Sequence, residues 1–141
     1  MSEPEAVIRP ARRDDIAAVL ELWAAARSPH ATTPDDNEAV GLAVAAGALL
    51  VAERDGRIVG TLLAGWDGWR GSMARLAVAP DTRRQGIAHR LVAAGERRLR
   101  DCGARRINAL VDASDDGVRE MWRKAGYADD PATTRFVRNI V

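Results

Sequence analysis

The chain has 141 residues with 21 basic and 20 acidic side chains, which gives a formal net charge of +1 at pH 7. This length is typical of one domain with a substantial core, so we expect residues 1–141 to form a single domain. The near balance of charge argues against a nucleic-acid partner, because nucleic-acid-binding domains usually carry a clear basic excess.

The cysteine content and the apolar segments bear on the compartment. Cys102 is the only cysteine, which excludes an intramolecular disulfide framework and a cysteine-rich zinc site. The first residues are polar and lack the apolar segment of a signal peptide. The longest apolar run, 40–52, is interrupted by Gly41 and Gly47 and is too short to span a bilayer. We therefore expect a cytoplasmic protein with no membrane partner and no bound metal.

Hydrophobic periodicity and turn residues divide the chain into strands and helices. In chain order they predict a strand at Val7–Arg9, a helix from Asp14 or Asp15 to about Arg27, a helix from Thr33 to near Gly47, strands at Leu49–Glu53, Ile58–Ala64 and Ser72–Val78, a helix from about Gly86 to Cys102, a buried strand at Arg106–Val111, a helix at Asp115–Ala125 and a last strand from Thr133 to Val141.

Local signals support the boundaries of these elements. Thr33 as N-cap with Pro34 at the first helical position predicts a helix start. The dipeptide Asp55-Gly56 predicts a tight hairpin turn, and Gly103 predicts the end of the long helix. An antiparallel meander followed by a strand-helix-strand crossover indicates an α/β domain with three layers, in which helices flank a mixed central sheet.

The loop Arg83–Ala88, between the last strand of the meander and the long helix, has the features of an anion-binding site. The first amides of a helix have no partners within the helix and lie at the positive end of its dipole. Gly86 lets the backbone approach a ligand closely, and the small Ala88 leaves room. Arg83 and Arg84 add positive charge, so this loop is suited to bind a diphosphate. The glycine patterns of dinucleotide folds and of P-loops are absent.

The loop has the pattern Arg-x-x-Gly-x-Ala, which resembles motif A of the GNAT superfamily of N-acetyltransferases, usually written Arg/Gln-x-x-Gly-x-Gly/Ala. The strand end Leu76–Pro80 and the later segment Met121–Tyr127 also look like this family. So do the opening Ile8–Ala11 and the hairpin Val51–Gly60. The resemblance covers nearly the whole chain and implies a GNAT-like fold.

The resemblance implies that acetyl-coenzyme A (acetyl-CoA) binds as co-substrate. The backbone of 76–78 would pair with its pantetheine arm like an added strand, and the amides from Arg84 to His89 would hold its pyrophosphate. An amide near Val78 would stabilise the oxyanion that develops on the thioester. The implied cofactor-binding residues are Leu76, Ala77, Val78, Arg83, Arg84, Gln85, Gly86, Ile87, Ala88, His89, Asp115 and Trp122.

Two positions depart from the family pattern. Asp115 stands where the family often has an asparagine that binds pantetheine; an ionised aspartate can only accept, and a plain helix N-cap is the alternative. Trp122 stands where the family has the tyrosine that protonates the departing thiolate, and an indole N–H does not ionise usefully. The thiolate could then leave unprotonated, water could supply the proton, or the protein could be a poor enzyme. Tyr127, the only tyrosine, is a less favoured substitute acid.

The catalytic candidates are therefore Val78 through its amide, Trp122 and, as general base, Asp67. Asp112 and Glu53 are alternative bases by strand position, and no spacing selects among the three carboxylates.

Three further side chains have two interpretations each. Arg75 either faces the acceptor, where it would favour an acceptor with a carboxylate or phosphate, or points into solvent. Trp66 and Trp69 flank a turn and either form an aromatic wall or interface patch, or cover the sheet edge.

Two functions fit these features. The first is an N-acetyltransferase that moves acetyl from acetyl-CoA to a primary amine by direct attack; the acceptor would be a small molecule, a protein N-terminus or a lysine. The second is a catalytically weak acyl-CoA-binding module with a sensing or interaction role, which the tryptophan at position 122 motivates. The sequence names no acceptor, and the oligomeric state stays open, with a homodimer among the states that the resemblance suggests.

Overall fold

The computed structural model of the chain describes residues 5–26 and 36–140. Its elements, in chain order, are β1 (Val7–Pro10), the short 3-10 helix η1 (Arg13–Asp15), α1 (Ile16–Ala26), α2 (Asn37–Ala45), β2 (Leu49–Arg54), β3 (Arg57–Trp66), β4 (Gly71–Val78), the 3-10 helix η2 (Pro80–Thr82), α3 (Ile87–Cys102), β5 (Ile107–Ala109) and α4 (Asp116–Lys124).

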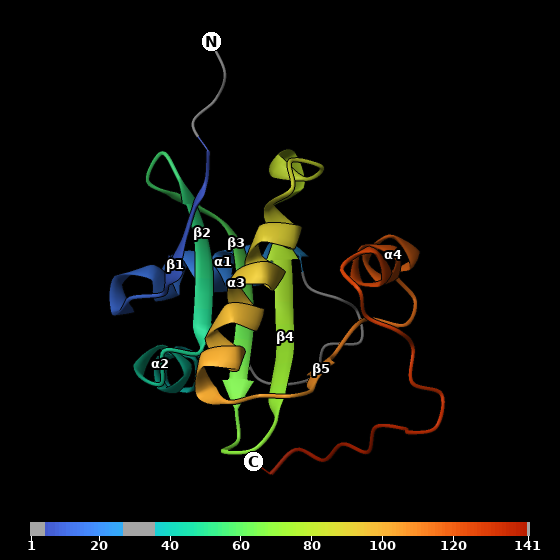
Figure 1. Cartoon of the computed structure of the whole chain (residues 1–141). Helices are drawn as coiled ribbons and strands as arrows, with labels where there is room; N and C mark the ends of the chain where they lie inside the picture. The colour runs from blue at the N-terminus through green and yellow to red at the C-terminus, as the bar shows by residue number, and fades with distance from the viewer. Residues whose placement is uncertain (1–4, 27–35, 141) are drawn as a thin grey trace.

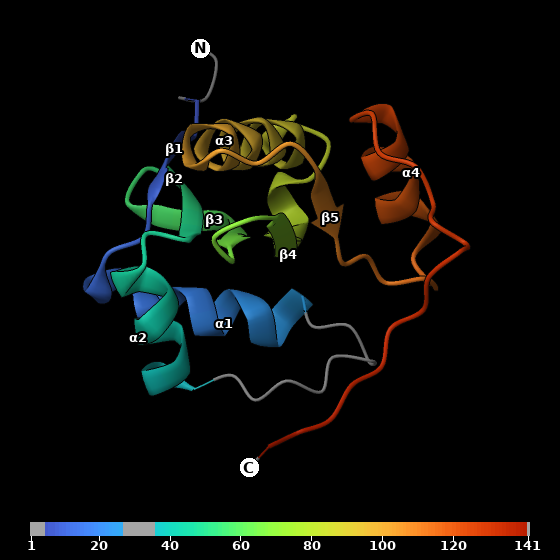
Figure 2. The same ribbon diagram turned by 60° about the horizontal axis from the view of Figure 1, so that its bottom comes forward.

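The five strands form one mixed sheet in the order β1-β2-β3-β4-β5 (Figure 1). β1 to β4 are antiparallel neighbours, and β4 pairs with β5 in parallel. α3 covers one face of the sheet, α1 and α2 lie on the other face, and α4 lies beside the sheet on the β5 side (Figure 2). This confirms the α/β three-layer architecture expected from the sequence.

Helix α3 lies unusually close to the sheet. Its buried face carries Leu91, Val92 and Leu99, which recur at helical spacing. Gly95 on the same face allows the close approach, because a Cβ built there would lie 2.7 Å from Cδ2 of Leu62 and 3.2 Å from Cε of Met73. The crossover helix is therefore fixed against β3 and β4, whose ends carry the candidate site.

The β2–β3 hairpin turns where the sequence predicts. Asp55 and Gly56 both have positive φ, 53° and 76°, as a two-residue type I′ turn requires. The turn lies beside η2, since Arg57 pairs with the carboxylate of Asp81 at 2.8 Å. The ion pair thus connects the tip of the hairpin to the segment just before the loop Arg83–Ala88.

An ionic cluster holds β1 to β2 and to the start of α1. The Arg9 guanidinium contacts Asp15 Oδ2 at 2.7 Å and Glu53 Oε2 at 2.7 Å. Asp15 also accepts a hydrogen bond from the Arg12 amide at 2.7 Å. The hydrogen bond from Arg9 lowers the pKa of the Asp15 carboxyl, although partial burial opposes this shift. The prediction that Asp14 or Asp15 caps the helix is wrong, because the N-cap is Arg12; Asp15 lies three residues later and accepts from the Arg12 amide.

Three further sequence predictions differ from the structure. The strand predicted from Thr133 is absent: residues 133–140 form no regular element, and Phe136 and Ile140 are 92% and 86% exposed. A strand needs a hydrogen-bonded neighbour, and no described strand lies beside this segment. The strand predicted at Arg106–Val111 is shorter and no more than half-buried, because β5 is an edge strand among the described residues.

The third difference concerns the second helix. α2 begins at Asn37, and Asp36 is its N-cap, with the Asp36 side chain accepting from the Ala39 amide at 2.7 Å. The predicted cap Thr33 and Pro34 lie outside the described residues, as does Arg27 at the predicted end of the first helix. None of the helices in the described ranges is long and apolar enough to cross a membrane.

Candidate functional site

The pairing of β4 changes at a bulge near its centre. Thr61 pairs with Ala77 and Leu63 pairs with Ala74, so β4 has one residue more than β3 between these pairs. Arg75 lies in this interval with a left-handed φ of 57°, which is rare for a residue other than glycine. β4 therefore bends just where its pairing with β5 stops.

β5 leaves β4 after a short stretch of pairing. The parallel register runs only from Gly71 to Met73 of β4, and the last bond is donated by the Leu110 amide to the Met73 carbonyl at 2.9 Å. Figure 1 shows β5 as a short strand beside the first half of β4. The segment Ala74–Val78 is half-buried and has no strand partner on that side.

The bulge decides which backbone groups face the unpartnered side. The Ala79 amide donates to the Val59 carbonyl, so the backbone polar groups of Ala79 face β3. These groups alternate along a strand: those of every second residue before Ala79 also face β3, and those of the residues in between face the opposite side. Ala77 therefore faces β3, whereas Leu76 and Val78 direct their amides and carbonyls toward the side that β5 has left. Of the three strand residues expected at the cofactor, two are oriented for such a contact and Ala77 is not.

The loop between η2 and α3 presents unused amides. No hydrogen bond in the described part of the chain uses the amides of Arg83 to His89, and the first helix-type bond after the loop is donated by Arg90 to Gly86. Arg84 and Gly86 have φ of 65° and 79°, whereas Gln85 between them has no positive φ. This alternation is the backbone pattern of an anion-binding nest, and it lies at the N-terminus of a long helix. We call the segment from Arg83 to His89 the nest loop.

Side chains around the loop hold its shape and add charge. Arg54, from the hairpin tip, donates to Oε1 of Gln85. Arg83 donates from Nε to the Val78 carbonyl at 3.4 Å. Arg83, Arg84 and His89 are exposed. The loop is therefore connected both to the β2–β3 turn and to the end of β4.

These two features fit one extended anionic ligand. The nest and the helix N-terminus suit a diphosphate, and the outward-facing backbone groups of Leu76 and Val78 suit an amide-bearing chain that adds to the strand edge. A Cβ at Gly86 would meet nothing within 4 Å, so the surface in front of the loop is open. An acyl-CoA has this combination of a diphosphate and an amide-bearing arm.

Comparison with known proteins agrees with this chemistry. The model of the acetyltransferase (GNAT) family matches residues 13–127. The chain belongs to the GNAT family. An acetyltransferase of Pectobacterium atrosepticum is 36% identical over 121 residues, which cover 85% of this chain and 86% of the relative. The match includes both the nest loop and the Trp122 region.

Solved GNAT structures have the same fold. The N-acetylglutamate synthase of Neisseria gonorrhoeae, complexed with coenzyme A and N-acetyl-glutamate, superposes with a TM-score of 0.73 at 23% identity; the match covers 85% of this chain but 28% of that longer protein. An aminoglycoside N-acetyltransferase in complex with coenzyme A has a TM-score of 0.73 at 18% identity, covering 100% of this chain and 98% of its own. Acetyl-CoA is accordingly the co-substrate expected of this GNAT chain.

The aromatic residues near the C-terminal end of the GNAT domain are packed rather than free. Trp122 is 4% exposed and meets the Tyr127 ring edge-to-face with 4.9 Å between centroids. The Tyr127 hydroxyl donates to Glu96 of α3 at 3.1 Å. Burial and the Glu96 charge raise the pKa of Tyr127 well above its usual value. Tyr127 is therefore a weaker proton donor than an ordinary tyrosine.

The Trp122 indole N–H makes no hydrogen bond. Among the described residues, no buried side-chain nitrogen or oxygen lacks a partner, so this N–H must reach the molecular surface. Trp122 thus has a polar tip that a ligand could contact, but no proton to give up near neutral pH.

The candidate carboxylates have different surroundings. Asp67 lies in the β3–β4 turn, at the opposite end of β4 from Val78, and accepts from the amides of Trp69 and Arg70. These hydrogen bonds lower its pKa. Glu53 lies on β2, two strands away from β4, and is paired with Arg9. The structure therefore does not bring Asp67 or Glu53 together with Val78.

Asp112 and Asp115 follow β5. Asp112 is half-buried and lies in the loop three residues after the end of β5, beyond the last strand pair, Met73–Ala109. It accepts hydrogen bonds from the amide and hydroxyl of Ser114. Asp115 is the N-cap of α4, accepting from the Val118 amide at 3.0 Å, so the helix-cap interpretation is confirmed. Its contact with pantetheine stays a prediction.

The structure also shows the surroundings of Arg75 and of the two tryptophans at the β3–β4 turn. The Arg75 guanidinium stacks over the Trp23 ring of α1 at 4.6 Å, so Arg75 is not simply a solvated side chain. Trp69 is 76% exposed, whereas Trp66 is half-buried near Gly103. The β3–β4 turn, which follows Trp66 and carries Trp69, lies at the end of the sheet away from the nest loop (Figure 1); a role of either ring beside the acceptor stays a prediction.

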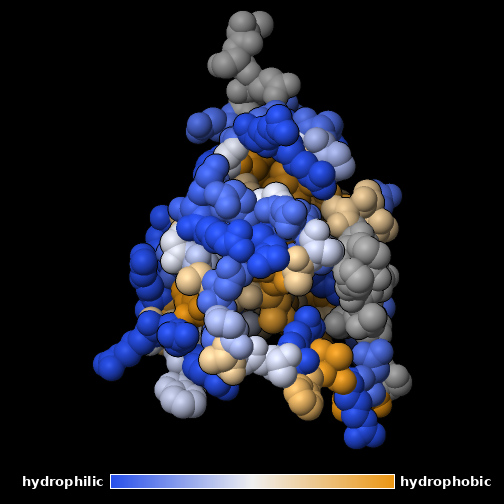
Figure 3. All heavy atoms as spheres, turned by 90° about the vertical axis from the view of Figure 1, so that its right-hand side faces the viewer, coloured by the Kyte–Doolittle hydropathy of each residue, from blue (hydrophilic) through white to orange (hydrophobic). Residues whose placement is uncertain are grey.

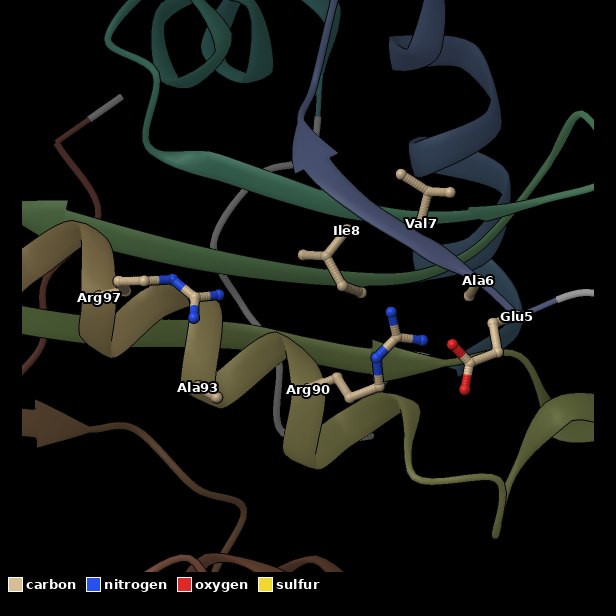
Figure 4. A pocket seen from close by; sticks show the side chains of 7 residues that line it. All are labelled: Glu5, Ala6, Val7, Ile8, Arg90, Ala93 and Arg97. Carbon is tan, nitrogen blue, oxygen red and sulfur yellow. The ribbon is translucent and has the colours of Figure 1, made fainter.

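A separate shallow groove lies along the β1 edge of the sheet, opposite the edge formed by β5. It has a volume of about 580 Å³ and runs between β1 and α3, lined by residues such as Ile8, Arg90 and Arg97 (Figure 4). None of its lining residues belongs to the nest loop or to the outward-facing part of β4. The face that carries α4 is mainly hydrophilic, with hydrophobic residues visible only between the polar ones (Figure 3).

The sequence did not point to three residues that shape the site. Trp23, Thr61 and Arg54 come from α1, β3 and the hairpin tip, far from the nest loop in the chain. Trp23 could be recognised only as a residue of an apolar helix face, and Thr61 only as a strand residue. No local pattern reports a contact between elements.

Proposed function

We propose that this GNAT protein transfers the acetyl group of acetyl-CoA to a primary amine by direct attack, without a covalent enzyme intermediate. The observation that carries the proposal is the run of unused amides from Arg83 to His89 at the N-terminus of α3, continuous with the outward-facing backbone of β4. Bound acetyl-CoA supplies an activated thioester. The chain's residues bind it, orient it and polarise its carbonyl.

The nest loop would hold the pyrophosphate. Its amides donate hydrogen bonds to a doubly charged group, and the α3 dipole adds to the attraction. Arg83 and Arg84 lie at the rim, where each adds positive charge. Because the donors are fixed by backbone conformation, binding costs little ordering of side chains.

The backbone of Leu76 and Val78 would receive the pantetheine arm. Their polar groups face the side without a strand partner, so the arm can take the place of a strand. The Val78 amide is the donor assigned to the thioester oxygen. A donor fixed before the reaction stabilises the negative charge that develops there without reorganisation.

We assign the general base to Asp112. It is the half-buried candidate carboxylate in the loop after β5, on the side of β4 where the strand pairing stops. Asp112→Asn can keep the Ser114 hydrogen bonds, because the asparagine side chain still has an accepting oxygen. The variant should lose the acidic limb of the kcat/KM–pH profile and at least tenfold in kcat at pH 7. An unchanged profile would remove Asp112 from the mechanism.

No side chain is assigned as general acid. The Trp122 indole cannot donate a proton usefully, and the raised pKa of Tyr127 makes it a poor donor. An ordinary thiol has a pKa of about 8.5, so the departing thiolate is a tolerable leaving group that water can protonate.

The deciding experiment measures thiol release from acetyl-CoA with a panel of amines. The panel includes free amino acids, a peptide with a free N-terminus, a peptide with an internal lysine and an aminoglycoside, because the solved neighbours are named for acceptors as different as glutamate and aminoglycosides. At least one class should release thiol well above the enzyme-free rate. No release with any class would count against the proposal.

A matched pair of variants tests the cofactor site. Gly86→Asp and Gly86→Asn have the same size, and both residues tolerate a positive φ better than most. Only aspartate places a negative charge in front of the loop. We expect coenzyme A to bind at least tenfold more weakly to the aspartate variant than to the asparagine variant, by calorimetry. Equal affinities would show that the pyrophosphate binds elsewhere.

A further inference from the structure

Thr61 has a polar side chain in the centre of the hydrophobic core. Thr61 is 0% exposed and lies on β3 between the two helical layers. The Thr61 hydroxyl accepts a hydrogen bond from Nε1 of Trp23 at 2.9 Å and donates one to the carbonyl of Arg75 at 2.9 Å. A single hydroxyl thus connects α1, β3 and β4. Burying such a group is favourable only when both hydrogen bonds are made.

The carbonyl that Thr61 binds is the one at the β4 bulge. Arg75 has a φ of 57°, a conformation that costs free energy for any residue with a side chain. A bulge also leaves backbone groups outside the regular ladder, and an unpaired carbonyl in the core would cost more. Thr61 supplies that partner. Trp23 holds the same residue from the other end, because its ring stacks under the Arg75 guanidinium at 4.6 Å.

The bulge determines the direction of the amides beyond it. Before the bulge, Met73 faces β5, where its carbonyl accepts from Leu110. A regular strand would continue this alternation, so Ala77 would face the β5 side and Val78 would face β3. The additional residue reverses the order, and Val78 faces the unpartnered side instead. The donor assigned to the thioester is available only because the bulge is present.

We propose that Thr61, oriented by Trp23, is a positioning residue for acetyl transfer: it locks the Arg75 bulge and thereby aims the amides of Leu76 and Val78 at the thioester. The inference rests on the proposed function for its catalytic consequence. Its structural part, the direction of two amides, can be measured without any turnover.

The test compares two substitutions of Thr61 that alter different parts of the side chain. Thr61→Val replaces the hydroxyl by a methyl group of similar size and removes both hydrogen bonds. Thr61→Ser keeps the hydroxyl and removes the methyl group. In assigned amide NMR spectra of the full chain, we expect the Leu76 and Val78 resonances, and their response to added coenzyme A, to change in Thr61→Val and to stay close to wild type in Thr61→Ser.

Steady-state kinetics with an active amine supplies the second readout. Thr61→Val should lower kcat at least tenfold and should raise the KM for acetyl-CoA by a smaller factor, because the nest loop still holds the pyrophosphate while the pantetheine contacts and the oxyanion donor are misdirected. Thr61→Ser should keep kcat within about threefold of wild type. A merely structural threonine would lower stability in both variants and leave kcat per folded molecule unchanged, which would overturn the proposal.

Trp23→Phe keeps the proposal testable if Thr61→Val does not fold. It removes the indole N–H but leaves an aromatic ring under Arg75 and the Thr61 hydroxyl in place. We expect a smaller loss of kcat, about two- to fivefold, with the same selective change at the Leu76 and Val78 amides. Unchanged resonances at these two amides would overturn the proposal. If wild type acetylates no amine while the resonances respond as expected, the proposed function fails, and only the structural part of the inference, that Thr61 sets the direction of the Leu76 and Val78 amides, stands.

Discussion

At the scale of single residues, Trp122 combines a packing role with the position at which the family resemblance predicts a proton donor. It is 4% exposed, lies against Tyr127 and has an indole N–H that reaches the surface without a protein partner. A tyrosine at this position would place an ionisable hydroxyl near that surface. Tryptophan at this position therefore satisfies the requirement for packing but supplies no ionisable proton donor.

Replacing Trp122 by Tyr and by Phe distinguishes these requirements. Both substitutions shorten the side chain and should lower the free energy of unfolding by about 1–2 kcal/mol through loss of packing. Only tyrosine adds a group that can protonate the departing thiolate. We expect kcat of Trp122→Tyr to exceed that of Trp122→Phe at least tenfold, measured by thiol release, with similar coenzyme A affinity. Equal kcat values would show that no acid is needed here.

The Arg9–Asp15 pair predicts a dependence of stability on pH. The pKa of Asp15 is lowered by its hydrogen bond from Arg9, so ionised Asp15 stabilises the fold above its unfolded pKa of about 3.9. This contribution is lost as the pH falls through the lower, folded pKa. Asp15→Asn should cost about 1–3 kcal/mol at pH 7, and the difference from wild type should shrink as the pH falls below the unfolded pKa.

Urea unfolding at pH 7 and at an acidic pH well below the unfolded pKa measures this difference. Asp14→Asn is the control, because Asp14 is an exposed neighbour in the same short helix. It should change the free energy of unfolding by less than about 0.5 kcal/mol at either pH. A pH-independent cost of Asp15→Asn would show that the charge of Asp15 does not contribute.

At the scale of elements, the position of α3 against the sheet holds the nest loop beside the end of β4. Gly95 allows this close packing, since a Cβ there would lie 2.7 Å from Leu62. Gly41 in α2 offers a contrast, because a Cβ there would meet nothing within 4 Å. Both glycines lie inside helices, where alanine is intrinsically better by about 1 kcal/mol.

The same substitution should therefore have opposite effects at the two positions. Gly95→Ala should lower the free energy of unfolding by about 1–3 kcal/mol, because overpacking exceeds the gain in helix propensity. Gly41→Ala should raise it by about 0.5–1 kcal/mol. Chemical denaturation of both variants beside wild type measures the two changes. Stabilisation by Gly95→Ala would show that α3 can move away from the sheet at little cost.

At the scale of the whole molecule, the C-terminal segment is the part least connected to the rest. Thr133 bonds to Asp130, whereas residues 134–140 make no hydrogen bond in the described structure. Phe136 is 92% exposed and Ile140 is 86% exposed, although both belong to the strand predicted from the sequence. In this arrangement their apolar surface contributes almost nothing to the folded state.

Truncation after Thr133 should consequently leave stability nearly unchanged. We expect the free energy of unfolding to differ from wild type by less than about 0.5 kcal/mol, measured by urea denaturation at two protein concentrations. A loss above about 2 kcal/mol would mean that the segment packs as a strand in solution. If that loss also grew with protein concentration, the strand would be paired with a second copy of the chain.

Local patterns in the sequence were sufficient for most of the elements and for the ligand-binding loop. The Asp55-Gly56 turn, the Gly103 helix end and the α3 periodicity act over a few residues, so their effects are readable in the chain. The same holds for Gly86, which the pattern places where the backbone can approach a ligand; the structure adds that its φ is positive. Family membership followed from these patterns and is confirmed by the match over residues 13–127.

The tertiary structure alone decided which groups face the ligand. The Arg75 bulge depends on a hydroxyl from β3 and a ring from α1, and the side that Val78 faces depends on the bulge. The exposed position of residues 134–140 likewise depends on whether a neighbouring strand is available. Hydrogen bonds between distant segments leave no periodic trace in a single sequence. The chain therefore specifies its helices, turns and nest loop locally, while the orientation of the Val78 amide, which we propose to be catalytic, results from packing between elements.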